Sequence, residues 1–214
     1  MRHRLVVGVL GICGLLPAAC VGEGDPEGHE ATPPAALTGT LALVAGSRWT
    51  GGDTYPPPPY GFEAGSLLEN ASFPGPDGPI DFASFRDPDA KLLVVHSYAN
   101  WCFWCTMSVP AQVEWYERYE PEGLRMLNLI FEDTDGDPAD VAAAEEVFGP
   151  EGFDVNFPFA ADPYFDLGRY YDAAAMPLFL FIDLPEMRIR SLETGFDAEL
   201  YESMIQAALA EPRE

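Results

Sequence analysis

From residue 71 onward, short apolar runs alternate with polar segments rich in Gly, Pro and Asp. Apolar runs bounded by polar residues predict buried strands at residues 91–98, 124–131, 178–182 and 188–193. Segments with helical character follow these strands, at residues 106–119, 138–148, 165–171 and 198–209. Strands that alternate with helices are typical of an α/β fold, and the last two strands are close enough in sequence to pair antiparallel.

Proline and glycine mark the ends of several of these elements. The run at residues 74–79, Pro-Gly-Pro-Asp-Gly-Pro, separates two short apolar segments and predicts a β-hairpin before the sheet. Pro110 falls inside the helix predicted at residues 106–119, where it should introduce a kink. Pro138 stands at the first position of the next helix, and Asp137 before it is the expected N-cap.

The first 19 residues have the pattern of a secretory signal peptide. Arg2 and Arg4 give a positively charged start, and the apolar run that follows is too short to span a bilayer of about 30 Å. Residues 16–20, Leu-Pro-Ala-Ala-Cys, resemble a bacterial lipobox with proline where leucine is usual. We therefore expect residues 1–19 to be removed and Cys20 to carry a lipid, with ordinary cleavage nearby or an uncleaved anchor as alternatives.

A segment rich in Gly, Pro, Ala, Thr and acidic residues follows, from residue 20 to residue 59. It ends in a run of prolines typical of extended polyproline II. We expect this segment to be a tether that holds one folded domain, residues 60–212, on the extracytoplasmic side of a membrane, in the periplasm or at the cell surface. Within this tether, residues 41–44 are a candidate for a short strand.

The chain is strongly acidic, with 35 Asp and Glu against 11 Lys and Arg and a formal net charge of −24. Nucleic acid is therefore excluded as a partner, because phosphate binding requires clustered basic residues. The acidic run at residues 132–137 lacks the glycine position of an EF-hand and predicts a solvated turn and helix cap.

Four cysteines are present, and two of them, Cys13 and Cys20, fall in the signal and at the lipid site. The other two, Cys102 and Cys105, lie between a predicted strand and a predicted helix. Unpaired N–H groups and the dipole at a helix N-terminus favour a thiolate, so we interpret this pair as a redox couple. An inert disulfide and half of a zinc site are the alternatives; zinc needs four ligands and only His96 is near, so no metal is expected.

The stretch at residues 98–105, Tyr-Ala-Asn-Trp-Cys-Phe-Trp-Cys, resembles the signature of TlpA/ResA-like membrane-tethered thiol-disulfide oxidoreductases of the AhpC/TSA-redoxin superfamily. Pro110 is similar to the helix-kinking proline of that family, and Met176-Pro177 is similar to its cis-proline loop. Residues 157–162 resemble the segment that such proteins insert between the halves of the sheet. The resemblance implies a thioredoxin-like fold with a central mixed sheet flanked by helices, an N-terminal hairpin and an inserted strand-helix segment.

The resemblance also implies a role for each site residue. Cys102 would form a mixed disulfide with a partner, and Cys105 would resolve it. Pro177 would be cis, so that the backbone of Met176 can pair with an extended substrate. His96, six residues before Cys102, stands where thioredoxins have a buried acid; it either transfers protons in place of that acid or is a satisfied core histidine.

The aromatic residues around the pair are less usual. Trp101 is expected to pack beside the loop and shield it, whereas Phe103 and Trp104 depart from the commoner choices of the family and leave the redox direction open.

Together these features predict an extracytoplasmic thiol-disulfide oxidoreductase. Its partners would be exported proteins with thiols or disulfides and an electron donor or acceptor, and it needs no cofactor besides the Cys102–Cys105 disulfide. One alternative is a thiol peroxidase of the redoxin type, which requires a threonine where Ala99 stands. Another is a copper-binding metallochaperone that uses both thiolates, with His96 or Met176 as a further soft ligand.

Overall fold

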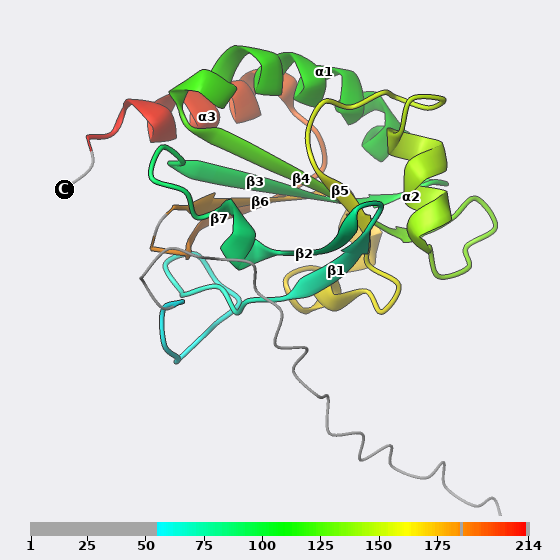
Figure 1. Ribbon diagram of the computed structural model, residues 1–214, viewed down its shortest axis with the longest axis horizontal. Helices are drawn as coiled ribbons and strands as arrows, with labels where there is room; N and C mark the ends of the chain where they lie inside the picture. The colour runs from blue at the N-terminus through cyan, green and yellow to red at the C-terminus, as the bar shows by residue number, and fades with distance from the viewer. Residues whose placement is uncertain (1–54, 185, 213–214) are drawn as a thin grey trace, which may run out of the picture. The chain divides into compact units, whose positions relative to one another are not determined.

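The computed structural model describes residues 55–184 and 186–212. The expected signal peptide, Cys20, the possible strand at residues 41–44 and most of the expected tether lie outside the described residues. In chain order (Figure 1), the elements, with η marking 3-10 helices, are β1 (Ser72–Gly75), β2 (Gly78–Asp81), η1 (Phe82–Phe85), β3 (Leu92–Ala99), α1 (Phe103–Tyr119), η2 (Glu120–Glu122), β4 (Leu124–Glu132), α2 (Val141–Phe148), β5 (Phe159–Ala161), η3 (Asp166–Arg169), η4 (Ala173–Ala175), β6 (Leu178–Asp183), β7 (Arg188–Thr194) and α3 (Ala198–Ala210). Within these ranges, no helix has the length and apolar character needed to cross a membrane.

A five-stranded mixed sheet with the order β5-β4-β3-β6-β7 forms the centre of the domain. Strands β3, β4 and β5 run parallel, while β6 and β7 are antiparallel to their neighbours. Every residue of β3 is buried, as expected for a central strand covered on both faces. The predicted hairpin is also present, because β1 pairs with β2 around a short turn. The predicted fold class is therefore confirmed.

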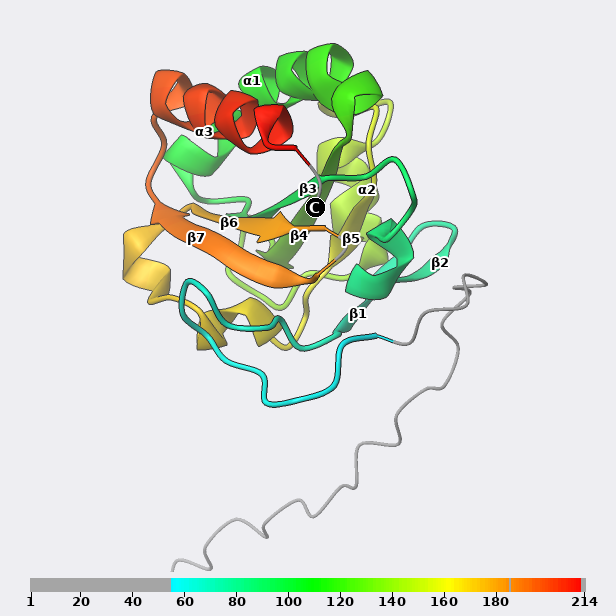
Figure 2. The ribbon, with the colours of Figure 1, turned by 90° about the vertical axis from the view of Figure 1, so that its left-hand side faces the viewer.

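The alternation of side chains along the strands divides the core between the two faces of the sheet. On one face, Leu92 and Val94 pack with aromatic residues of α1 and α3. On the other, Leu93 and Val95 pack with the hairpin, η1 and η3. Figures 1 and 2 show α1 and α3 together over one face and β1 and β2 on the opposite side. The redox motif therefore begins a helix that is held by an extensive apolar interface.

Two local predictions around β4 and α2 are wrong. The helix expected from Pro138 begins at Val141, and its N-cap is Asp140, whose carboxylate accepts a hydrogen bond from the amide of Ala143 at 3.0 Å. Pro138 instead bridges to Glu132, because the preceding acidic residues close a turn of their own. Strand β5 falls within residues 157–162, where the resemblance implied an inserted strand-helix segment, although three residues are too few to show an alternating pattern on their own.

The proline-rich segment assigned to the end of the tether contacts the domain. The Tyr55 hydroxyl donates a hydrogen bond of 2.8 Å to the carbonyl of Leu68, and its ring packs against the core. The Tyr60 hydroxyl donates to the carbonyl of Pro56 at 2.8 Å. Packing against the domain thus begins several residues before the expected boundary at residue 60.

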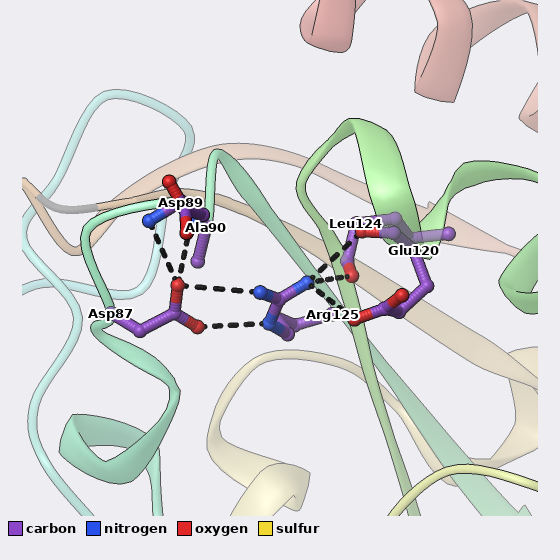
Figure 3. Close-up of polar contacts among 6 residues, drawn as sticks. All are labelled: Asp87, Asp89, Ala90, Glu120, Leu124 and Arg125. Carbon is purple, nitrogen blue, oxygen red and sulfur yellow. Dashed lines mark hydrogen bonds and ion pairs between the residues drawn. The ribbon is translucent and has the colours of Figure 1, made fainter.

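An ion pair joins three segments at the end of the sheet where β3 and β4 begin. The guanidinium of Arg125 contacts both carboxylate oxygens of Asp87, at 2.9 and 3.2 Å, and donates to the carbonyls of Leu124 and Glu120 (Figure 3). Burial alone would raise the pKa of Asp87, but hydrogen bonds from Arg125 and from backbone amides lower it. This contact ties the loop before β3 to the end of α1.

Candidate functional site

The two cysteines lie where β3 passes into α1. Cys102 is the N-cap of α1, and its Sγ accepts a hydrogen bond of 3.2 Å from the backbone amide of Cys105. The two residues form a disulfide with a Cα–Cα distance of 5.3 Å. The predicted location of the pair at a helix N-terminus is therefore confirmed, and the free amides of the first turn face a sulfur that becomes a thiolate on reduction.

The two sulfur-bearing residues differ in accessibility. Cys102 is 7% exposed, whereas Cys105 is 0% exposed and packs among apolar residues of β3, β4 and α2. Of the two residues, only Cys102 therefore has any contact with solvent.

Hydroxyl and amide groups fix the loop that carries Cys102. The buried Tyr98 hydroxyl lies 3.1 Å from the hydroxyl of Thr106 in α1 and donates to the Asn100 side chain at 3.3 Å. The Asn100 amide in turn donates to Thr134 at 2.7 Å, which links this loop to the one after β4. The sequence pattern indicated no separate role for these residues, although Tyr98 and Asn100 lie within the stretch that resembles the family signature.

Trp101 also contacts the loop after β4. Its indole Nε1 donates a hydrogen bond of 2.7 Å to Glu132, and half of its side chain is exposed. The expectation that Trp101 packs beside the loop agrees with this contact, but its ring also forms part of the surface. Phe103 and Trp104 are more exposed still and meet edge to face, with ring centroids 5.3 Å apart.

The peptide bond between Met176 and Pro177 is cis, as predicted. Pro177 is buried directly before β6, where Leu178 pairs with Ser97 of β3. This register places the proline at the end of β3 that leads to the cysteines. Met176 is partly buried and packs against the apolar cluster that contains both cysteines.

His96 is fully buried beneath the first turns of α1. Its Nδ1 lies 3.2 Å from the amide nitrogen of Gln112 and its Nε2 lies 3.4 Å from the hydroxyl of Ser108. Ser108 donates a hydrogen bond of 2.7 Å to the carbonyl of Cys105. The imidazole ring stacks on Phe179, with centroids 4.6 Å apart. A chain of buried hydrogen bonds therefore connects His96 to the backbone of the second cysteine.

Burial lowers the pKa of His96 to about 3, against a smaller opposing effect of Asn128 on the neighbouring strand. The ring is therefore neutral near pH 7, and it hydrogen-bonds as a neutral imidazole rather than as an imidazolium. The spacing Cys105, Ser108 and Gln112 follows one face of a helix, which is the signal by which the sequence could have indicated this cluster.

A second buried titratable group lies close to the site. Asp162 follows β5 and accepts hydrogen bonds from the amides of Asp166 and Leu167 at 2.8 and 3.1 Å. Burial raises its pKa to about 6, although these amides oppose the shift. Burial raises the pKa of Tyr171, and the charges of Asp162 and Glu132 raise it further.

Among residues 55–184 and 186–212, no group of three or more His, Cys, Asp or Glu side chains could hold a metal ion. His96, considered as a copper ligand, has both ring nitrogens in contact with side chains of α1.

The sequence of the domain matches the profile of a known protein family. The sequence profile described as AhpC/TSA family matches residues 69–191, a range that includes both cysteines and the whole sheet except the last residues of β7. No curated protein matches the chain significantly.

Solved structures share the fold at low sequence identity. A protein from Chlorobium tepidum assigned as thiol:disulfide interchange protein DsbE has a TM-score of 0.58 and 21% identity, covering 70% of this chain and 100% of its own. One from Bacteroides thetaiotaomicron assigned as a protein disulfide isomerase has a TM-score of 0.56 and 19% identity, covering 71% and 93%. A thiol:disulfide interchange protein from Bacteroides sp. has a TM-score of 0.55 and 14% identity, covering 71% and 93%. This likeness establishes the thioredoxin-like fold.

Proposed function

Because the chain belongs to the AhpC/TSA family, we propose that it is an extracytoplasmic thiol-disulfide oxidoreductase that exchanges disulfides with exported proteins. The observation that carries this proposal is the Cys102–Cys105 disulfide at the start of α1, in which Cys102 is slightly exposed and Cys105 is fully buried.

The exchange follows from this geometry. A partner thiolate attacks Sγ of Cys102, the bond between the two cysteines breaks, and Cys105 leaves as a thiolate. A second partner thiolate then attacks the mixed disulfide and releases Cys102, so that two electrons pass from the partner to the pair. The amide of Cys105, 3.2 Å from Sγ of Cys102, stabilises the thiolate that is released. The reverse steps reduce a partner disulfide, and the difference in reduction potential sets the direction.

The N-terminal sequence supports export and attachment to a membrane. In this proposal residues 1–19 are a signal peptide, Cys20 carries a lipid, and the segment from residue 20 forms a tether whose last residues, from Tyr55, pack on the domain. Replacing Cys20 by alanine would then abolish incorporation of a radiolabelled fatty acid and release the protein from the membrane fraction. Equal labelling of the alanine variant and the wild type would show that the lipid is attached elsewhere. No labelling of the wild type would show that no lipid is attached.

Exchange with a disulfide-bonded test protein provides the direct test of activity. The wild-type chain should accelerate reduction of that protein by a dithiol, and Cys102→Ser should reduce the rate to background. Cys105→Ser should instead accumulate a mixed disulfide through Cys102, visible by mass spectrometry. Wild-type activity no higher than that of Cys102→Ser would contradict the proposed function.

A further inference from the structure

Exposed large apolar residues flank the two cysteines in the chain. We call Trp101, Phe103, Trp104 and Met107 the aromatic platform; their side chains are 50%, 64%, 57% and 51% exposed. In the described part of the chain, other large apolar side chains with comparable exposure are Phe62, Tyr164 and Leu200. Most such exposure is therefore gathered at one place, and exposed apolar clusters of this kind mark interaction sites.

The platform adjoins a loop of strongly acidic character, residues 132–137. Glu132 accepts the hydrogen bond from Trp101, and Thr134 accepts the one from Asn100. The Asp133 carboxylate accepts hydrogen bonds from the amides of Asp135 and Asp137, so it holds the loop closed. Asp135 and Asp137 are exposed and belong to the same loop as Glu132, which binds Trp101.

Positive charge is scarce in the segments that build this end of the domain. Residues 92–117, 126–168 and 170–187 contain no Lys or Arg, and Arg169, which lies between the last two ranges, pairs with Glu69. The basic side chains of the neighbouring segments are engaged elsewhere, as Lys91 donates to the carbonyl of Leu209 and Arg125 binds Asp87. Because Leu92 pairs with Leu124, Lys91 and Arg125 lie at the end of β3 and β4 opposite the cysteines.

We infer that the partner segment recognised at Cys102 is cationic as well as apolar, with Lys or Arg close to its reactive cysteine. This inference rests on the proposed function and specifies its substrate class. The faces of Trp101 and Trp104 attract cations through their π-electrons. The acidic loop adds an attraction that no nearby basic residue of the described chain offsets, and such complementarity speeds encounter and excludes acidic partners.

Two peptides that differ only in the charge around one cysteine test this inference. One carries Lys and the other Glu on both sides of an otherwise identical apolar segment. The oxidised full-length protein is mixed with each peptide at pH 7, and formation of the mixed disulfide is followed by mass spectrometry. A Lys side chain near a cysteine also makes its thiol more reactive. The rate of mixed-disulfide formation with each peptide is therefore divided by the rate at which the same peptide reacts with an uncharged small disulfide.

The corrected rate should be at least about tenfold higher for the Lys peptide at low salt, and the ratio should fall below about threefold at 0.5 M salt, where exposed charges are screened. Asp135→Asn with Asp137→Asn should lower the ratio at least about threefold, since loop closure by Asp133 is retained. The matched control is Glu117→Gln with Glu122→Gln, which removes the same charge at the far end of α1 and should leave the ratio unchanged.

Trp104→Ser tests the aromatic part of the platform. It should slow the Lys peptide more than the Glu peptide, whereas equal slowing would show that the ring contributes apolar contact alone and would contradict the cation contact. Equal corrected rates for the two peptides with the wild-type protein would overturn the inference and leave the proposed function standing. If an uncharged small thiol also fails to reduce the Cys102–Cys105 disulfide, the proposed function itself fails.

Discussion

The indole Nε1 of Trp101 donates a hydrogen bond of 2.7 Å to the carboxylate of Glu132, across 31 positions of the chain. This contact joins the residue before the first cysteine to the last residue of β4. The backbone amide of Asn100 donates to the carbonyl of Glu132 at 3.0 Å and reinforces the link. The position of the loop that presents Cys102 therefore depends on the strand next to it.

Replacing Glu132 by alanine should release the Trp101 indole. Because the contact is exposed, the free energy of unfolding should fall by only about 0.5–1.5 kcal/mol, measured by urea denaturation. The indole proton of Trp101 should exchange with solvent several-fold faster, measured by NMR with Trp101→Phe to assign the signal. Glu132→Gln keeps an acceptor and should preserve slow exchange; equally fast exchange in both variants would show that the hydrogen bond does not persist in solution.

The two cysteines should differ in reactivity once the protein is reduced. Cys102 should be alkylated by iodoacetamide at least about tenfold faster than Cys105, because Cys105 is fully buried. Peptide mapping by mass spectrometry gives both rates. In 8 M urea the rates should agree within about twofold, and comparable rates in the folded protein would contradict the proposed division of roles.

The buried histidine should make stability depend on pH. With its pKa lowered from 6.5 to about 3, His96 stays neutral in the folded protein while it binds a proton in the unfolded chain below pH 6.5. Its contribution is therefore present above pH 6.5 and declines as the pH falls. Between pH 7.5 and pH 5 the stability difference between wild type and His96→Gln should shift by about 2 kcal/mol against the wild type. A pH-independent difference would contradict the lowered pKa.

Asp162 should give the opposite dependence. Its pKa is raised from 3.8 to about 6, so the folded protein binds a proton more readily than the unfolded chain between these values. Stability from this group therefore rises as the pH falls through 6. In the same urea measurements, the difference between wild type and Asp162→Asn should move by about 1 kcal/mol in favour of the wild type at pH 5. Movement in the same direction as for His96→Gln would refute the raised pKa.

The Asp87–Arg125 contact in Figure 3 should contribute to folding. Asp87→Ala leaves a mostly buried guanidinium without its carboxylate, and the expected loss in the free energy of unfolding is about 1–3 kcal/mol. The control is Glu69→Ala, which breaks a more exposed ion pair with Arg169 and should cost less than about 1 kcal/mol. Equal losses would show that the burial of Arg125 has no energetic effect.

Several parts of the fold were predictable because their causes are local. Strand β3 consists only of buried residues, and α3 has an apolar face at helical spacing. The first cysteine lies shortly after the end of β3 and shortly before the apolar positions of α1. The start of the helix therefore falls at this cysteine. In contrast, Asp140 and Asp137 are both suitable caps by sequence, and only the turn closed by Asp133 decides in favour of Asp140.

The placement of two cysteines at the start of a helix after a buried strand follows from the sequence, because adjacent residues and their hydrophobic pattern dictate that arrangement. What surrounds the two cysteines depends on the folding of the whole domain. Contacts between residues far apart in the chain bring Glu132 to Trp101, Pro177 to the end of β3 and Ser108 to His96. The sequence therefore identified the aromatic residues around Cys102, and the packing of the sheet decided that they form an exposed surface beside an acidic loop.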